Sequence, residues 1–495
     1  MAEWEFQKIT LSTVTRSGTS TLLPQWEQGP KHCVPWVPFW LQIKKMPHHD
    51  LLIIGAGSGN TIIGPEHDHL DIAIAEPAEF GGTCMNRGCI PSKMLVYAAD
   101  LSINAQTANK LGVKSSFSGV DWRAIQTRIF GRIDPIAEAG LSYRENLENV
   151  TVYRDKAAFL SEKTLSIAGE VVSADQIVIA AGAQPDIPQL SGLSETPFHT
   201  SDSIMRISEL PDRIVIIGGG FIAIEMAHIF GAFGSEVIMV LRGEEFLREA
   251  DPSIRKRITE IYKERFTVYL SEEVEHVSHE EKFFINLKKG TDIEADELLI
   301  ATGRNPNTDS LKPEKGGVRC DESGYVITDE YLRTSAEGVW ALGDITNPLQ
   351  LKHTANAEAR IVSNNLLNPK NLIKIDRSVI PKAVFGNPQI ASVGPTEDDL
   401  LRDKVPYLKS VRDYSDTAFG WAMEDQQGFV KLLIDPATRL LLGAHIIGYQ
   451  ASTLIQQLVT AMNVSITVDE LARNQLYVHP ALPEVIEQAL LGFEE

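Results

Sequence analysis

The sequence predicts an α/β protein with two doubly wound domains, followed by a third domain. Two short apolar runs, Leu51–Ile54 and Ile214–Ile217, each lead directly into a glycine-rich turn. A buried parallel strand that ends in such a turn is the start of a βαβ unit. From about residue 376 the sequence pattern changes, which indicates the third domain.

Length and charge narrow the possible classes of protein. With 495 residues the chain is too long for one core, and its 43% hydrophobic and 23% charged residues are those of a globular protein. The net charge of −20 makes nucleic acid and anionic membranes poor partners. No apolar run is long enough, without charges or glycines, to span a membrane. We therefore expect about two to four domains, without a nucleic-acid or membrane partner.

Residues 1–45 differ from the rest of the chain. They hold four of the seven tryptophans among scattered Ser, Thr and Pro residues. No basic start precedes an apolar core, so the segment is not a clean secretory signal. We expect a poorly ordered extension that ends just before Met46, with a targeting or docking segment as the alternative.

The first glycine-rich turn has the pattern of a dinucleotide fingerprint. Gly55 and Gly57, with Ser58 beside them, permit a tight turn and the close approach of a pyrophosphate to a helix N-terminus. Asn60 stands where the third glycine is usual, and we expect it only to loosen helix–strand packing. Glu76 ends the next strand, about 20 residues on, where an acid holds a ribose hydroxyl.

The second turn repeats this pattern with Gly218, Gly220 and Ala223. Two fingerprints about 160 residues apart predict two dinucleotides in one chain. The strand after the second fingerprint ends without an acid; Arg242 follows it, and Arg248 lies six residues on. Guanidinium groups suit a 2′-phosphate, which predicts NADPH in preference to NADH. The alternative is a solvated arginine pair in an acid-rich loop.

The stretch Gly81–Lys93 holds two cysteines, Cys84 and Cys89, five residues apart. On a regular helix these positions lie roughly 140° apart, so a disulfide between them needs a distorted first turn. A thiol near a helix N-terminus is easier to ionise. The pattern predicts a redox centre, whereas a structural disulfide or half of a zinc site are the alternatives.

Near the C-terminus, Pro480 makes the preceding His479 extended. Pro483 starts the last helix and places Glu484 in its first turn. The Glu484 carboxylate can then lie against the His479 imidazole and orient it. With the cysteine motif present, this pair predicts an acid–base group.

Together these motifs resemble those of the pyridine nucleotide-disulfide oxidoreductases over residues 47–495. The resemblance implies FAD at the first fingerprint, NADPH at the second and no metal. It implies an FAD-binding and central domain at 46–184 and 306–372, an NADPH-binding domain at 185–305, and an α+β dimerisation domain at 376–495.

The resemblance also implies roles for single residues. Cys84 and Cys89 would form a redox disulfide, with Cys89 as the flavin-side thiol and Cys84 as the thiol that attacks a disulfide substrate. The partner subunit's His479, paired with Glu484, would protonate the leaving thiolate. Cofactor contacts are further implied at Thr83, Lys93, Ala157, Gly182, Glu225, Gly303, Gly343 and Asp344.

The substrate is expected to be a small disulfide, because the chain ends without a further cysteine pair. Asn60, residues 128–135, residues 420–425 and Thr453 resemble the branch that reduces mycothione, the disulfide of a cysteinyl glucosamine-inositol thiol. Thr453 stands where an acid is common, and a neutral site suits a sugar-bearing substrate. Activity of the glutathione reductase or dihydrolipoamide dehydrogenase type is the alternative. A non-catalytic flavoprotein scaffold is an alternative of another class.

The segment Ala451–Asn463 carries apolar residues with i, i+3, i+4 spacing, which predicts an amphipathic helix. Core packing within one subunit and a dimer face would explain this pattern equally well, and the resemblance favours the dimer face. We expect a cytoplasmic homodimer.

Overall fold

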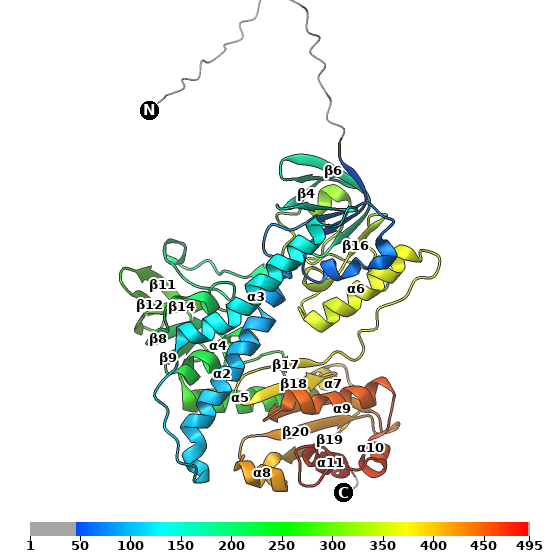
Figure 1. Ribbon diagram of the computed structural model, residues 1–495. Helices are drawn as coiled ribbons and strands as arrows, with labels where there is room; N and C mark the ends of the chain where they lie inside the picture. The colour runs from blue at the N-terminus through cyan, green and yellow to red at the C-terminus, as the bar shows by residue number, and fades with distance from the viewer. Residues whose placement is uncertain (1–45, 494–495) are drawn as a thin grey trace, which may run out of the picture. The chain divides into compact units, whose positions relative to one another are not determined.

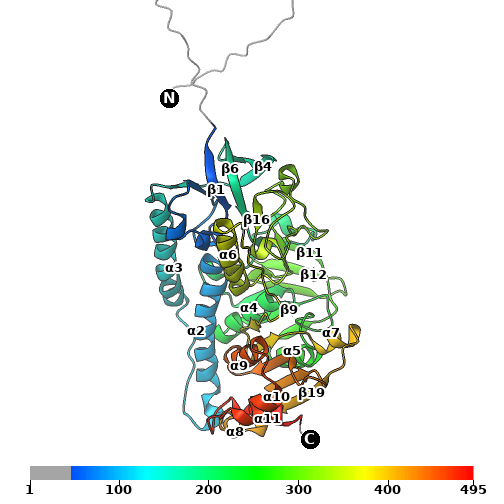
Figure 2. The ribbon, with the colours of Figure 1, turned by 90° about the vertical axis from the view of Figure 1, so that its right-hand side faces the viewer.

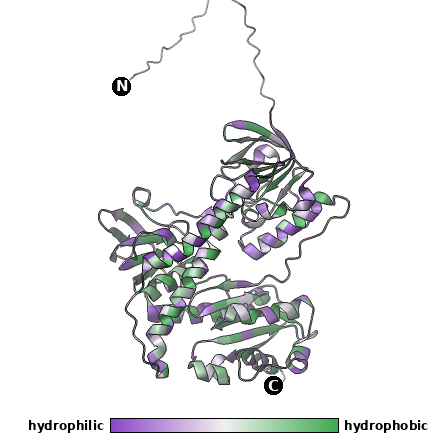
Figure 3. Cartoon of the chain, in the orientation of Figure 1, coloured by the Kyte–Doolittle hydropathy of each residue, from purple (hydrophilic) through white to green (hydrophobic). Residues whose placement is uncertain are grey.

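The computed structural model describes residues 46–493, so the predicted extension at 1–45 lies outside the described residues. The described chain forms three groups of strands with helices packed around them (Figure 1). The predicted α/β fold class is confirmed. Most strands are apolar, whereas α3 and α6 mix polar and apolar positions (Figure 3). No helix within residues 46–493 is long and apolar enough to cross a membrane.

The first sheet has seven strands in the order β3-β2-β1-β6-β5-β4, with β16 paired to β6. Strand β1 runs parallel to both β2 and β6, and its Leu51–Ile54 segment is buried, as expected for a central parallel strand. The strands are β1 (His48–Ile54), β2 (Ile72–Ala75), β3 (Val150–Tyr153), β4 (Ala157–Ser161), β5 (Thr164–Ile167), β6 (Glu170–Ile179) and β16 (Val339–Ala341).

Two long helices, α2 (Cys89–Thr107) and α3 (Trp122–Glu145), run side by side along the molecule (Figures 1 and 2). The short helix α1 (Gly82–Asn86) precedes α2, and α6 (Lys352–Leu367) packs against the first glycine-rich turn. Asp121 caps α3 by accepting a hydrogen bond from the Ala124 N–H. These helices place the start of α2 and the start of α6 beside the first fingerprint.

The second sheet is parallel, in the order β10-β9-β8-β14, and is flanked by α4 and α5. Helix α4 follows the second fingerprint and packs against α2, which joins the second sheet to the long helices beside the first fingerprint. A small antiparallel sheet lies next to it, and β7 pairs with β15. The elements are β8 (Arg213–Ile217), α4 (Phe221–Phe233), β9 (Glu236–Val240), α5 (Pro252–Arg265), β10 (Thr267–Tyr269), β14 (Glu297–Ile300), β11 (Val274–His279), β12 (Phe283–Leu287), β13 (Asp292–Ala295), β7 (Ala183–Pro185) and β15 (Arg304–Pro306).

The C-terminal part is an antiparallel sheet in the order β17-β18-β21-β20-β19 with helices around it. This is the predicted α+β arrangement. Its elements are β17 (Lys382–Val384), β18 (Gln389–Val393), α7 (Glu397–Arg402), β19 (Leu408–Asp413), α8 (Ala418–Met423), β20 (Phe429–Ile434), β21 (Leu441–Gly448), α9 (Ala451–Asn463), α10 (Val468–Asn474) and α11 (Glu484–Leu491).

Helix α9 corrects one expectation. Its apolar face, with Leu454, Ile455 and Leu458, is buried in the core of the C-terminal sheet, where α9 packs on β18 and β21. Placing this face on the dimer surface was therefore wrong. The amphipathic pattern specifies an apolar face, but it does not specify what covers that face.

The first fingerprint corrects a second expectation. No α-helix follows it; the chain makes two short 3₁₀ turns instead, Gly59–Ile62 and Pro65–His67. Pro65 lacks an N–H and obstructs the preceding turn, so a helix started at Gly59 cannot continue through it. The buried guanidinium of Arg144 on α3 holds this segment by donating to the Asn60 side chain at 2.8 Å and to the Asn60 carbonyl at 2.9 Å. Asn60 thus binds α3 through Arg144, whereas we expected it only to loosen the packing of a helix on the strand.

Candidate active site

A cavity of about 490 Å³ opens where the first sheet, α2, α4 and α6 meet. Of the predicted site residues, it is lined by Gly55, Gly57, Ser58, Glu76, Thr83, Cys84, Cys89, Lys93, Ala157, Gly182, Glu225, Gly343 and Asp344. It is not lined by Gly218, Gly220, Ala223, Arg242, Arg248, Gly303, His479 or Glu484.

The two fingerprints share one packing feature. A Cβ at Gly55 would lie 2.3 Å from the Ala180 carbonyl oxygen, and a Cβ at Gly218 would lie 2.1 Å from that of Ala301. Both glycines also have positive φ, 107° and 136°. Only glycine permits so close an approach of two chain segments in this conformation. Each fingerprint is thereby packed against the segment that leaves the adjacent strand of its own sheet.

Glu76 and Asp344 place carboxylates in the cavity. The Glu76 carboxylate accepts the Ala56 N–H at 2.7 Å and the Ala78 N–H at 2.9 Å, so part of its acceptor capacity already organises the fingerprint turn. Burial raises the pKa of Asp344, against the charges of Arg304 and Lys352. Close-packed glycines, a strand-end acid and a second buried acid fit a dinucleotide with its ribose and pyrophosphate.

The two cysteines lie on separate helical segments. Cys84 belongs to α1 and Cys89 begins α2, with the chain broken between them at Arg87 and Gly88. This break is the distorted first turn that the spacing requires. Both are free thiols, and their side chains hydrogen-bond to each other.

The two thiols differ in acidity. The hydrogen bond from Cys84 lowers the pKa of Cys89 to about 7, aided by the charge of Lys93 and opposed by burial. The same hydrogen bond, together with burial, raises the pKa of Cys84. In the dithiol form Cys89 therefore ionises first, and Cys84 keeps its proton.

Lys93 on α2 pairs with Glu225 on α4. The ammonium lies 2.6 and 2.7 Å from the two carboxylate oxygens, and Glu225 also accepts the Phe385 N–H at 3.1 Å. The Lys93 ammonium is 4.7 Å from the centre of the Phe385 ring. These contacts join the cavity, helix α4 and the start of the C-terminal sheet.

The second fingerprint faces an open region. A Cβ at Gly220 would meet no atom within 4 Å, whereas Ala223 is buried on α4. The chain after β9 folds back on the second fingerprint, where the Leu247 N–H donates to the Gly219 carbonyl at 2.8 Å. Arg242 is exposed and has no ion pair within residues 46–493; the exposed Arg248 pairs only with its neighbour Glu249. The Arg242 guanidinium thus lies close to this turn in the sequence and forms no ion pair with any residue of 46–493.

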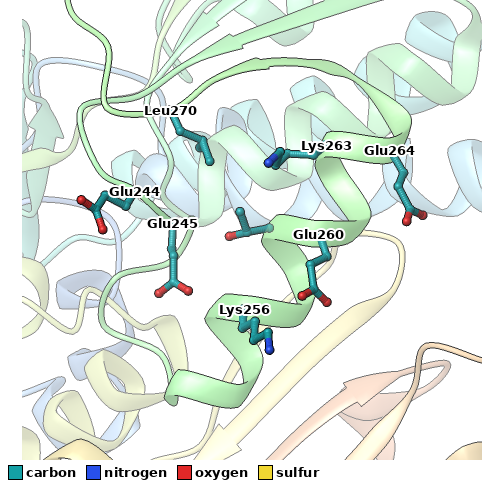
Figure 4. Close-up of a pocket in the computed structure, with 8 residues that line it drawn as sticks. Glu244, Glu245, Lys256, Glu260, Lys263, Glu264 and Leu270 are labelled. Carbon is teal, nitrogen blue, oxygen red and sulfur yellow. The ribbon is translucent and has the colours of Figure 1, made fainter.

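A further hollow of about 430 Å³ lies along α5 (Figure 4). Its wall mixes acids, including Glu244 and Glu260, with Lys256 and Lys263. None of the predicted site residues lines it. No group of three His, Cys, Asp or Glu side chains that could hold a metal occurs in the part of the chain that the structure describes.

His479 and Glu484 come together at the start of α11. The His479 Nδ1 lies 2.5 Å from a Glu484 carboxylate oxygen, and the other oxygen accepts the Ala481 N–H at 3.2 Å. The histidine side chain is 73% exposed and that of Glu484 only 14%. Neither residue lines the cavity of the cysteines in its own chain.

Sequence reasoning missed two side chains of this site. Arg144, which holds Asn60, and Lys352, which starts α6 and reaches the cavity, contact residues far away in the chain. The only local signal for Lys352 is its place eight residues after Asp344, at the start of a helix.

Comparisons with known proteins agree with this geometry. A family described as pyridine nucleotide-disulphide oxidoreductase matches residues 49–359, and its dimerisation domain matches residues 380–490. Mycothione reductase of Mycobacterium tuberculosis is 46% identical over 460 residues, covering 90% of this chain and all of the relative. Glutathione reductase of Burkholderia cepacia is 34% identical, covering 88% and 97%.

Among solved structures, the HOCl-induced flavoprotein disulfide reductase RclA from Escherichia coli matches with a TM-score of 0.79 and 27% identity, covering 89% of this chain and 99% of that one. The predicted enzyme class, a flavoprotein disulfide reductase, is confirmed, and the predicted FAD and NADPH agree with it. The chain belongs to the pyridine nucleotide-disulphide oxidoreductase family.

Proposed function

We propose that the chain is an NADPH-dependent reductase of a small disulfide, and that this disulfide is mycothione. The observation that carries the proposal is the Cys84–Cys89 pair, split between α1 and α2 in the cavity that the first fingerprint also lines. The substrate follows from the relative that is 46% identical over its whole length and is named mycothione reductase. The working form is a homodimer in the cytoplasm, with the C-terminal sheet as its dimerisation domain.

FAD, when bound beside the cysteines, supplies electron transfer between NADPH and their disulfide. Gly55, Gly57, Ser58, Glu76, Thr83, Ala157, Gly182, Gly343 and Asp344, which line the cavity, would hold it. The neutralised pair of Lys93 and Glu225 keeps a hydrogen-bonding ammonium next to Cys89 without leaving a bare charge there. This ammonium favours Cys89 as the thiolate.

The substrate half of the reaction uses both thiols in turn. The Cys84 sulfur loses its proton, attacks one substrate sulfur and releases the other as a thiolate. The Cys89 thiolate then attacks Cys84, re-forms the protein disulfide and releases the second substrate thiolate. The partner subunit's His479 takes the Cys84 proton and protonates a leaving thiolate, and Glu484 orients the ring.

Preference for NADPH rests on the second fingerprint. Gly218, Gly220 and Ala223 would receive the pyrophosphate, while the exposed Arg242 and Arg248 would meet the 2′-phosphate. Arg242 is the stronger candidate, because no carboxylate within residues 46–493 pairs with it.

Choice of mycothione is supported by the neutral surface at the start of α9. Thr453 is exposed there, close in sequence to the exposed Tyr449. A sugar-bearing disulfide is bound through hydrogen bonds to neutral groups of this kind. A charged side chain at this position would add little to its affinity. A glutathione reductase activity is the second candidate, because a relative with that name is 34% identical over 97% of its length.

The test compares kcat/KM for mycothione, glutathione disulfide and lipoamide with NADPH, using the FAD-loaded dimer. We expect a clear preference for mycothione. A preference for either other disulfide would overturn the substrate and leave the disulfide reductase standing. If the cysteines are reduced by NADPH and no disulfide turns over, the chain is a non-catalytic flavoprotein.

A further inference from the structure

Five cationic side chains line the cavity of the cysteines, and they differ in what neutralises them. Three face carboxylates: Arg87 with Glu79, Lys93 with Glu225, and Arg304 with Asp202. Lys156 is exposed to solvent and precedes β4. Lys352 is half-buried and has no carboxylate at ion-pair distance within residues 46–493. The charge of Lys352 is close enough to Asp344 to act on the pKa of that carboxyl, but the two groups form no ion pair.

Neutral groups hold Lys352 in place. It is the first residue of α6, and its ammonium donates to the Ser58 hydroxyl at 2.8 Å. Ser58 in turn donates to the side-chain oxygen of Asn356, one turn further along α6, at 3.2 Å. Because neither partner carries a charge, the charge of Lys352 remains available to its surroundings.

Cys84 lines the same cavity as Lys352, and Gly57, the neighbour of Ser58, packs against Gly82, two residues before Cys84. The hydrogen bond with Cys89 and burial raise the pKa of Cys84, and Lys352 acts in the opposite direction. Lys93 and Glu225 act on Cys89. Each thiol thus has its own lysine, but within residues 46–493 only the lysine that acts on Cys84 forms no ion pair with a carboxylate.

Reduction of the disulfide adds negative charge beside Cys84, so a cation without an ion-pair partner is useful there. A hydride equivalent brings two electrons and one proton, so reduction of the Cys84–Cys89 disulfide gives one thiol and one thiolate. The site gains one negative charge, and Cys89 holds it. Cys84 must then lose its own proton before it can attack, which would add a second negative charge beside the first.

We propose that Lys352 is a positioning residue for the attacking thiol: its charge, held by Ser58 and Asn356, favours the Cys84 thiolate. The inference rests on the proposed function. In the step that it assists, the Cys84 proton passes to the partner subunit's His479, and the Cys84 sulfur bonds to one substrate sulfur. The substrate S–S bond breaks, and its electron pair leaves with the other sulfur.

The test is alkylation of the NADPH-reduced, FAD-loaded enzyme by iodoacetamide across a range of pH, without any disulfide substrate. Mass spectrometry of peptides reports the Cys84 adduct. In Lys352→Met we expect Cys84 to react about tenfold more slowly near neutral pH, which corresponds to a shift of about one pKa unit. The difference should vanish at high pH, and Lys352→Arg should restore the wild-type profile.

Arg360→Met is the matched control, because it removes an exposed positive charge from the same helix. It should leave the alkylation profile unchanged. A wild-type profile in Lys352→Met would overturn the proposal. If that variant does not bind FAD, Lys352→Gln keeps a donor for Ser58 and carries the same expectation. Loss of all disulfide turnover in the wild type would instead overturn the proposed function, since alkylation needs no substrate.

Discussion

At the scale of single residues, the two cysteines have different roles in the proposed mechanism because only one of them ionises readily. The pKa of Cys89 is lowered to about 7, so a thiolate beside the flavin should give absorbance at wavelengths beyond the flavin bands. Cys84→Ser should show this absorbance without reduction, and the absorbance should rise with pH as Cys89 ionises. Cys89→Ser should not show it. Absorbance that survives Cys89→Ser would reverse the roles of the two thiols.

The second prediction for a single residue concerns Arg242 and the preference for NADPH. Arg242→Ala should raise KM for NADPH by about tenfold and leave that for NADH nearly unchanged, because a charged hydrogen bond contributes about 1.5–3 kcal/mol. Steady-state rates with both nucleotides measure the effect. Arg248→Ala is the comparison, since Arg248 already pairs with Glu249, and should change KM less. An equal rise in KM for NADPH and NADH would show that Arg242 does not bind the 2′-phosphate.

At the scale of elements, a buried ionic cluster joins α5 to the C-terminal sheet. The Lys431 ammonium on β20 lies 2.7 Å from the Asp251 carboxylate, which caps α5, and 2.6 Å from Glu397 on α7. Lys431 and Asp251 are both fully buried. Removing one member of such a pair leaves an uncompensated buried charge.

Lys431→Met should therefore lower the free energy of unfolding by about 3–5 kcal/mol, as measured by urea denaturation. Lys409→Met is the matched control. Lys409 contacts the same Glu397 at 2.9 Å, but its side chain is 55% exposed, so its loss should cost about 0–1 kcal/mol. Equal effects of the two substitutions would contradict the importance of burial.

The same cluster predicts acid sensitivity. Burial would raise the pKa of Glu397, but hydrogen bonds from Lys431, Tyr407 and Lys409 outweigh it and lower this pKa to about 2. The folded state therefore binds a proton on Glu397 less readily than the unfolded state, whose value is 4.5. This contribution to stability is complete above about pH 4.5 and is lost as the pH falls towards 2. Denaturation midpoints measured across this range should fall in the wild type and change less in Glu397→Gln.

At the scale of the whole molecule, the proposed mechanism needs two copies of the chain to bring the histidine to the cysteines. His479 is exposed and does not line its own chain's cavity. The nearby Leu476 and Val478 are 97% and 72% exposed, and Tyr97 on α2 is 65% exposed. Large apolar side chains left open in this way are typical of a surface that another copy covers.

Mixed dimers test this arrangement. Cys84→Ser and His479→Ala should each abolish disulfide reduction alone, while His479→Ala keeps reduction of the protein by NADPH. Equal mixing gives half heterodimers, each with one intact site of two, so about a quarter of wild-type activity should return. No recovery in purified heterodimers would place the histidine in the site of its own subunit.

The sequence by itself determined the parts of this protein that depend on neighbouring residues. Both fingerprints, the cysteine pair and the contact between His479 and Glu484 are short-range patterns, and the family follows from their order. The absent helix after Gly59 was also readable locally from Pro65, although the expectation of a standard fingerprint prevailed over it.

Only the tertiary structure decided the contacts that join distant segments. Lys352 meets Ser58 across 294 residues of sequence, and Lys431 meets Asp251 across 180. The buried face of α9 is of the same kind. A side chain's local sequence limits its conformation and chemistry, but the partner that neutralises or covers it depends on how strands and helices far apart in the chain pack together.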